Sequence, residues 1–292
     1  MKKVALFLLL LMGGLIIYAQ VGGIKSYSFT FQKIIPQQIF QTSDDLKRAV
    51  EDTLEDSEGK YAIFIKNFKT GEMYAKNENQ IFEPASLYKV WVMGAVFEKI
   101  KTGEILENDR LSADIAALNK KFAIPEEDAD LKEGVINFSI KSAVEQMITI
   151  SHNYAALALV DKVGSKNVKE FMKKYELDNS SFDPPLKTTA SEYGRFLEKL
   201  YQGEVINSEY SKKMIDVLSR QQKNDRIPKY LPKDIKVAHK TGELDNVRND
   251  AGIVYSPEVD FSIVVLSETE NVTDAAETIA QISKTVYDYF NK

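Results

Sequence analysis

The sequence predicts an α+β fold: an antiparallel β-sheet flanked by N- and C-terminal helices, with an inserted all-α subdomain. Strand-like segments lie near both ends of the region 43–292, whereas the residues between them have mainly helical periodicity. Two small isolated sheets would be only marginally stable, so we expect the first hairpin to pair with the last strands in one sheet. The helical middle is then an insertion into the sheet domain.

The N-terminus has the pattern of an export signal. Lys2 and Lys3 precede an apolar stretch at 4–17, which is the order of charge and hydrophobicity found in signal peptides. With residues 21–24 the stretch approaches the roughly 20 residues that span a bilayer, so a membrane anchor is the alternative. In both cases we expect the domain to be exported and extracytoplasmic, either secreted or held by this segment alone.

These observations predict the domain limits. Residues 1–24 form the signal peptide or anchor, residues 25–42 a tether, and residues 43–292 the folded domain. Its α/β part takes residues 43–85 and 221–292, and its all-α part residues 86–220.

Local patterns predict the individual elements. Ser43 is an expected N-cap, and Leu46, Val50 and Leu54 follow at helical spacing. Residues 61–68 and 72–75 are expected to form a hairpin that leads through Pro84 to a helix containing Ser86. The further expected helices are 144–150, 154–163, 168–175, 193–201 and a C-terminal helix with Ile279, Ile282 and Val286; the further strands are 236–239, 251–255 and 261–266.

Composition excludes several classes of function. The net charge of −5 arises from interspersed acids and bases, which gives no electrostatic reason to expect a nucleic-acid partner. Cysteine is absent and only two histidines are present, so we expect no disulfide, no thiolate nucleophile, no metal centre and no cofactor. The expected partner is a small molecule, and the expected state is a monomer.

Ser86 and Lys89 are the candidate catalytic pair. Three positions apart on one helix face, they can meet side by side, and a lysine held neutral can accept the proton of the serine hydroxyl. The helix continues with the apolar residues 90–96, and a lysine beside such a core helix is costly unless it is paired or neutral. Backbone N–H groups at the helix start can also help to bind an oxyanion. The pair therefore predicts serine acyl transfer.

Lys240, Thr241 and Gly242 end a strand-like run. They can supply a cation, a hydroxyl and a close approach to the backbone for a substrate carboxylate, and the N–H of Glu243 would be a second oxyanion donor. Arg248, across the following turn, is a candidate to bind the same carboxylate as a fork, with a surface arginine as the equal alternative.

The segment Ser151-His152-Asn153 interrupts a helical pattern, which indicates a loop that brings Ser151 and Asn153 to the cleft. We do not assign His152 to a Ser-His-Asp triad, because Lys89 already supplies a base and no serine lies in an elbow motif. His239 is expected to point away from the face of Lys240 and to be a hydrogen-bonded core residue.

The three motifs together resemble class A β-lactamases and the related penicillin-binding proteins. The similarity runs from about Ser43 to Phe290. It implies that Ser86 is the acylated nucleophile and Lys89 its proton acceptor. It further implies that Ser151 shuttles a proton to the leaving nitrogen, that Asn153 contacts a substrate amide, and that Lys240 and Thr241 bind the carboxylate. Arg248 matches the family arginine only if the hairpin after Gly242 is one residue shorter.

The sequence departs from the family pattern at two places. His152 stands where the family usually has aspartate. Class A enzymes also carry a long loop with a glutamate that positions the deacylating water, but here residues 181–189 shorten that loop and supply no matching glutamate. Asp183 and Glu192 are the nearest acids, and neither fits the pattern. An acyl-enzyme should therefore form and persist.

Three hypotheses follow. The first is an exported serine β-lactamase-type hydrolase that opens the β-lactam amide through an acyl-enzyme on Ser86. The second is a D,D-peptidase, either carboxypeptidase or transpeptidase, acting on wall peptides that end in D-alanine. The third is a weakly catalytic sensor of β-lactams or wall fragments. The acidic stretch 126–130 is most simply a solvated loop.

Overall fold

The computed structural model describes residues 43–292. The predicted export segment and tether, residues 1–24 and 25–42, lie outside the described residues. No helix within residues 43–292 is both long and apolar enough to cross a membrane.

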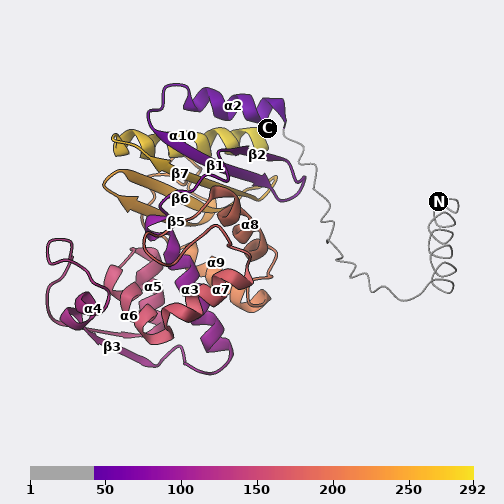
Figure 1. The fold of residues 1–292 in the computed structure, drawn as a ribbon. Helices are drawn as coiled ribbons and strands as arrows, with labels where there is room; N and C mark the ends of the chain where they lie inside the picture. Colours follow the sequence, from indigo (N-terminus) through magenta and orange to yellow (C-terminus); the bar gives the residue numbers. More distant parts are fainter. Residues whose placement is uncertain (1–42) are drawn as a thin grey trace, which may run out of the picture. The chain divides into compact units, whose positions relative to one another are not determined.

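A five-stranded antiparallel sheet forms the centre of the α/β part (Figure 1). Its strand order is β2-β1-β7-β6-β5, so the N-terminal hairpin pairs with the last strand of the chain, from Lys60 opposite Glu268 to Asn67 opposite Phe261. The predicted single sheet is therefore confirmed. The strands are β1 (Lys60–Asn67), β2 (Met73–Lys76), β5 (Lys236–Leu244), β6 (Val247–Tyr255) and β7 (Phe261–Glu268).

The two faces of the sheet bury different clusters of side chains. On β1, Ile63 and Ile65 belong to the cluster shared with the terminal helices, whereas Ala62 and Phe64 belong to the cluster shared with the helical part. This division follows from the alternation of side chains along a strand. Because both faces are covered, the strands are apolar on both sides, which explains their continuous hydrophobic runs.

The terminal helices α2 (Asp44–Leu54) and α10 (Val272–Phe290) pack side by side on one face (Figure 1). Ser43 caps α2, since its Oγ accepts hydrogen bonds from the backbone N of Asp45 at 3.1 Å and of Leu46 at 3.2 Å. The predicted helix and its cap are confirmed, and so is the C-terminal helix. The N-cap and the apolar spacing together specified this element.

The helical part covers the other face, and it contains a small sheet that the sequence analysis did not predict. Strands β3 (Arg110–Asp114) and β4 (Val135–Ser139) form a two-stranded antiparallel sheet within the region expected to be all-α. Both strands are short and largely exposed, so their hydrophobic pattern is weak. The helices are α3 (Lys89–Lys101), α4 (Ile115–Lys121), α5 (Ile140–Thr149), α6 (Asn153–Val163), α7 (Ser165–Lys174), α8 (Ala190–Tyr201) and α9 (Ser208–Leu218).

Candidate active site

Ser86 lies on a short 3₁₀ helix, η2 (Ala85–Tyr88), and Lys89 is the first residue of α3. The sequence analysis expected both residues on one continuous α-helix. In a 3₁₀ turn residues i and i+3 eclipse one another, so this geometry aligns Ser86 with Lys89 more directly than an α-helix does. The 3₁₀ turn therefore favours a side-by-side arrangement of the two side chains.

The Ser86 turn packs directly on strand β5 at Gly242. A Cβ placed on Gly242 would lie 2.6 Å from the carbonyl oxygen of Pro84 and 3.3 Å from Cβ of Ala85. Only a glycine permits this approach of two backbones. The contact sets the distance between the Ser86 turn and the edge strand of the sheet.

Two site residues adopt left-handed backbone conformations that non-glycine residues seldom occupy. Ala85 has a φ of 47° and Ser151 has a φ of 61°. Such residues are disfavoured by roughly 1–3 kcal/mol each and persist only where the surrounding packing imposes them. They lie next to the candidate nucleophile Ser86 and at the candidate proton shuttle Ser151, where the direction of a side chain matters most.

Lys89 is completely buried and is held by three oxygen atoms. Its Nζ donates to the backbone O of Ser151 at 2.6 Å, to Oδ1 of Asn153 at 2.6 Å and to Oγ of Ser151 at 3.1 Å. Burial lowers the pKa of Lys89 to about 7, a shift that the charge of Asp130 opposes and that of Lys223 enhances. A neutral amine is therefore well populated near neutral pH, as a general base requires.

Lys240 approaches the same serine from the sheet. Its Nζ lies 3.1 Å from Oγ of Ser151 and 2.9 Å from the backbone O of Thr241. Burial, followed by the nearby charge of Lys89, holds the pKa of Lys240 well below its usual range. Ser151 Oγ thus bridges two buried amines.

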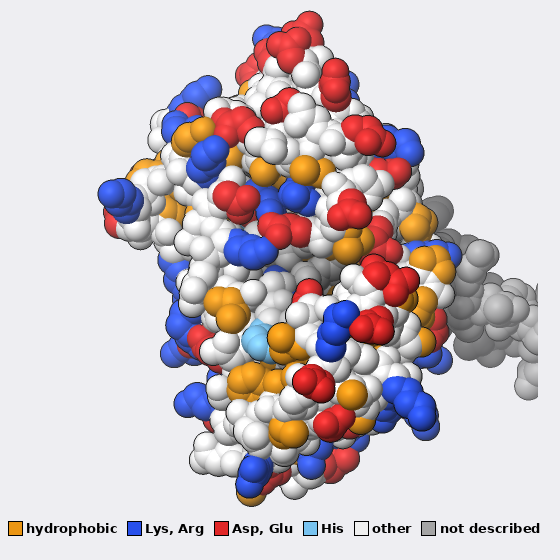
Figure 2. Space-filling model, turned by 90° about the vertical axis from the view of Figure 1, so that its left-hand side faces the viewer, with side chains coloured by type: hydrophobic (Ala, Val, Ile, Leu, Met, Phe, Trp, Pro, Cys, Tyr) orange, Lys and Arg blue, Asp and Glu red, His pale blue; other side chains and the backbone are white. Residues whose placement is uncertain are grey.

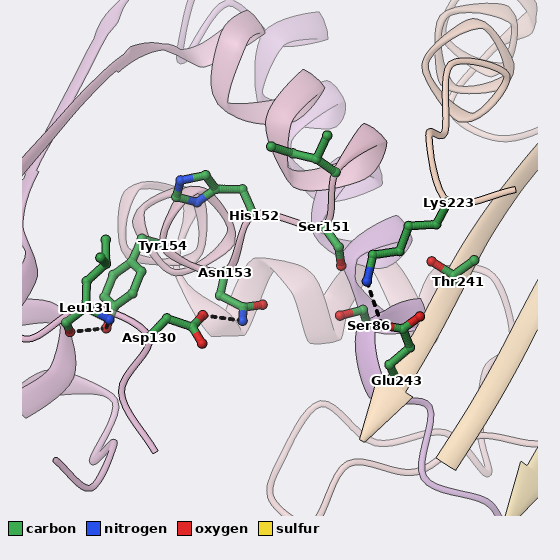
Figure 3. Close-up of a pocket in the computed structure, with 11 residues that line it drawn as sticks. Ser86, Asp130, Leu131, Ser151, His152, Asn153, Tyr154, Lys223, Thr241 and Glu243 are labelled. Atoms are coloured by element: carbon green, nitrogen blue, oxygen red, sulfur yellow. Dashed lines mark hydrogen bonds and ion pairs between the residues drawn. The ribbon is translucent and has the colours of Figure 1, made fainter. Parts of the chain in front are cut away.

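These residues adjoin a cavity of about 470 Å³. Figure 2 shows a face of the molecule that is hollowed near its middle, with a histidine side chain, in pale blue, close to the hollow. In Figure 3 Ser86 and Ser151 lie close together, with Thr241 and Glu243 on one side and Asn153 and Asp130 on the other. The cavity is lined by Ser86, Asp130, Leu131, Ile150, Ser151, His152, Asn153, Tyr154, Lys223, Thr241 and Glu243.

Asp130 enters the site from the loop between α4 and β4. Its Oδ2 accepts a hydrogen bond from Nδ2 of Asn153 at 2.7 Å. The loop is fixed next to this contact by the hydroxyl of Tyr154, which lies 2.5 Å from the backbone O of Leu131 and 2.8 Å from Oδ1 of Asn119. Asp130, which the sequence analysis expected on a solvated loop, is therefore part of the cavity wall.

Glu243 forms the opposite wall and is held by two cations. Lys223 donates to its Oε2 at 2.5 Å, and the fully buried Arg226 donates to its Oε1. Burial alone would raise the pKa of Glu243, but these two hydrogen-bonded cations lower it to about 2. Glu243 is therefore ionised at neutral pH and is a weak base.

The structure does not bring Arg248 into the cavity. Its Nη1 donates to the backbone O of Leu244 at 2.6 Å and of Val247 at 2.8 Å. The strand β5 continues through Lys240, Thr241 and Gly242 to Leu244, and only two residues separate it from β6, so the guanidinium folds back on its own hairpin. The other predicted site residues, Ser86, Lys89, Ser151, Asn153, Lys240, Thr241, Gly242 and Glu243, lie in the cavity wall or immediately beneath it.

The two histidines have structural partners. His152 Nδ1 accepts from the backbone N of Ala155 at 3.1 Å and so caps α6, which is the function an aspartate would have at that position. His239 is buried, with Nδ1 2.9 Å from Oδ1 of Asp250 and Nε2 3.3 Å from Oδ1 of Asn224. The prediction of a hydrogen-bonded core histidine is confirmed.

The segment between α7 and α8, residues 175–189, is a compact loop, and the two acids nearest to the family's glutamate position, Asp183 in the loop and Glu192 in α8, are engaged elsewhere. Glu192, only 1% exposed, accepts from the backbone N of Asn179 at 2.7 Å and from Ser180 Oγ at 2.8 Å. Asp183 pairs with Lys169 at the surface. None of the residues 175–189 lines the described cavity, so this loop contributes no carboxylate to it.

Comparison with known proteins identifies the family. The model of the beta-lactamase enzyme family matches residues 45–290. The chain belongs to this family of penicillin-recognising serine enzymes. A comparison with curated proteins finds no match.

Solved structures share the fold of this family member. PBP-A is similar with a TM-score of 0.76 and 21% identity, over 86% of this chain and 98% of that chain. A beta-lactamase from Sphaerobacter thermophilus is similar with a TM-score of 0.75 and 24% identity, over 84% of this chain and 97% of that chain. A variant of PBP-A, an acyl-enzyme complex with penicillin G, is similar with a TM-score of 0.75 and 22% identity, over 86% and 98%. The predicted α+β fold class is confirmed.

Proposed function

We propose that this member of the beta-lactamase enzyme family is acylated on Ser86 by β-lactams and releases the acyl group slowly. The observation that supports acylation is the buried Lys89, whose pKa of about 7 and oxygen contacts suit a base beside Ser86. In this scheme Ser86 Oγ attacks the lactam carbonyl and Lys89 takes its proton. The proton reaches the leaving nitrogen through Ser151, which Lys240 also contacts.

The remaining cavity residues have matching roles. The N–H groups of Ser86 and Glu243 stabilise the oxyanion, Thr241 and Lys240 bind the carboxylate, and Asn153 binds the acyl amide. Gly242 keeps the Ser86 turn close to β5. Arg248 has no role in this scheme, because its guanidinium is bound to its own hairpin.

Slow deacylation follows from the walls of the cavity. Of the described residues, Asp130 and Glu243 are the carboxylates that line it. Glu243 is bound by two cations and Asp130 by Asn153, so neither is placed as a base for water attacking the Ser86 ester. This observation equally favours a second candidate function, a D,D-peptidase on D-alanine-terminated peptides. Such an enzyme transfers its peptidyl group to a peptide amine or to water, and it releases the acyl group of a β-lactam only slowly.

The experiment follows intact mass and hydrolysis together. The purified protein is mixed with a fluorescent penicillin and with a reporter cephalosporin, with Ser86→Ala as control. A lasting adduct on the wild type, absent from Ser86→Ala, with little hydrolysis is the expected result; turnover of a D-alanyl peptide would then select the peptidase. Rapid Ser86-dependent hydrolysis would contradict slow deacylation, and labelling of Ser86→Ala would contradict the nucleophile.

A further inference from the structure

A carboxylate, an amide and an amine form one hydrogen-bonded chain at the site. Asp130 Oδ2 accepts from Nδ2 of Asn153 at 2.7 Å (Figure 3). Oδ1 of the same amide accepts from Nζ of Lys89 at 2.6 Å. The chain thus links an exposed loop carboxylate to the buried amine of Lys89. The scheme above gives Asp130 no role.

The carboxylate of Asp130 determines the orientation of the amide. An ionised carboxylate only accepts hydrogen bonds, whereas an asparagine side chain has a donating and an accepting end. While Asp130 holds Nδ2, the carbonyl Oδ1 must face Lys89. Nδ2 carries a second hydrogen, which stays available for a substrate carbonyl.

This orientation matters most when Lys89 is neutral. A neutral amine has two N–H donors and one lone pair. The two shortest contacts of Lys89, both 2.6 Å, go to the backbone O of Ser151 and to Oδ1 of Asn153, which accept only. Both donors are thereby used, and the lone pair is left on the side of the hydroxyls, where Ser151 Oγ lies at 3.1 Å.

We propose that Asp130 is a positioning residue for acylation: by holding Nδ2 of Asn153, it keeps Oδ1 on Lys89 and the amine's lone pair directed at the hydroxyls. If the amide turned over, Nδ2 would donate to that lone pair and block proton transfer from Ser86. The protonated amine enforces the same amide orientation by itself, so Asp130 is needed in the neutral, reactive state. This inference rests on the proposed acylation of Ser86.

Asp130 also acts on Lys89 through its charge. The charged and titratable groups around Lys89 are Asp130, Lys223, Lys240 and His152. Of these Asp130 is the anion, and it raises the pKa of Lys89 against the larger effect of burial. Asp130→Asn keeps the size of the side chain but removes the charge, and its amide can present either end to Asn153.

The test compares Asp130→Asn and Asp130→Ala with Glu127→Gln, which makes the same change of charge at an exposed position on the same loop. Stopped-flow labelling with fluorescent penicillin gives the acylation rate constant k2 and the reversible binding constant KS from pH 5 to 9. For both Asp130 variants we expect k2 to fall about 10-fold, a part of the 10²–10⁴ that a general base supplies. We expect KS to change less than about 2-fold and the acidic limb to move to lower pH. Glu127→Gln should match the wild type.

Two results would overturn the proposal. One is that both Asp130 variants have the same k2 and the same pH midpoint as the wild type. The other is that Glu127→Gln lowers k2 as much as they do, which would make the effect a general one of loop charge. NMR of ¹³C-labelled lysine gives a second readout, because Lys89 should titrate at lower pH in Asp130→Asn than in the wild type. If the wild type is not acylated, the proposed function fails, and an unchanged Lys89 titration would then separately overturn the inference.

Discussion

Lys89 and Lys240 converge on a single atom, because Nζ of each lies 3.1 Å from Oγ of Ser151. Two buried ammonium groups that share one hydroxyl disfavour each other's charge, in addition to the cost of burial. A substrate carboxylate beside Thr241 would favour the charged form of Lys240. In the proposed scheme Lys240 is then the charged amine that binds the carboxylate, and Lys89 is the neutral amine that accepts the proton of Ser86.

The first prediction concerns pH. Lys89 acts as a base only when neutral, so acylation should rise with pH, with a midpoint near the pKa of about 7, and should be lost as the pH falls through it. Lys89→Met keeps the stem but removes the amine, and it should lower k2/KS by about 10²–10⁴. Stopped-flow labelling from pH 5 to 9 measures both effects, with the exposed Lys120→Met as the matched control. A rate that is flat or falling through pH 7 would exclude Lys89 as the base.

The second prediction concerns the contact between the Ser86 turn and β5. Gly242→Ala places a Cβ 2.6 Å from Pro84 O, a backbone atom that cannot move without moving Ser86. We expect a loss of about 1–3 kcal/mol in the free energy of unfolding, together with slower acylation. Leu244→Ala, at an exposed position of the same strand, should change stability by less than about 0.5 kcal/mol. Urea unfolding measures the stability and penicillin labelling measures the acylation rate. If Gly242→Ala matches Leu244→Ala in stability and in acylation rate, the contact is not required.

The sequence was sufficient to predict the sheet and most of the helices, because burial on both sheet faces and the amphipathic terminal helices leave strong periodic patterns. Ile63 and Ile65 alternate with Ala62 and Phe64, and each pair packs in a different cluster. Ser86, Lys89 and Ser151 were also recognisable, since their spacing carries the chemistry. Their convergence around Lys89 is what the structure adds.

The residues that sequence reasoning missed have no such pattern. Asp130 meets Asn153 across 23 positions from an exposed loop, and the only signal was an acidic stretch that also suits a solvated surface. Lys223 belongs to none of the three motifs, and its contact with Glu243 depends on how the segment before β5 is folded. Arg248 was misleading because a two-residue hairpin turn changes the direction of its side chain.

The third prediction concerns acid stability. Two cations lower the pKa of Glu243 to about 2, so its contribution to stability is present above the unfolded pKa near 4.5 and is lost as the pH falls through 2. Glu243→Gln weakens the pairing of the buried Arg226, and we expect a loss of roughly 1–3 kcal/mol at pH 7. The difference from the wild type should shrink between pH 4.5 and 2 in thermal unfolding. Glu268→Gln, which breaks an exposed pair with Lys60, should have little effect. A pH-independent difference would argue against the ionised carboxylate as the cause.

The last prediction concerns His152, whose Nδ1 can cap α6 only when that nitrogen is unprotonated. Burial, and secondly the charge of Lys89, lower the pKa of His152. A lowered histidine pKa gives stability that is present above the unfolded value near 6.5 and is lost as the pH falls through the folded value. His152→Ala should cost about 1 kcal/mol at pH 7.5, whereas His152→Asn, a good cap, should not.

Urea unfolding at pH 7.5 and pH 5 separates these cases. The wild type should approach the stability of His152→Ala at pH 5, while His152→Asn should keep its cap. A wild type that retains its full advantage over His152→Ala at pH 5 would contradict the assignment.

The variant His152→Asn also clarifies the pH profile of acylation. His152 lies between Ser151 and Asn153, which together hold Lys89. Acid can therefore impair the base in two ways, by protonating Lys89 itself or by protonating His152. In His152→Asn the titration of the histidine is removed, and the acidic limb then reports Lys89 without it.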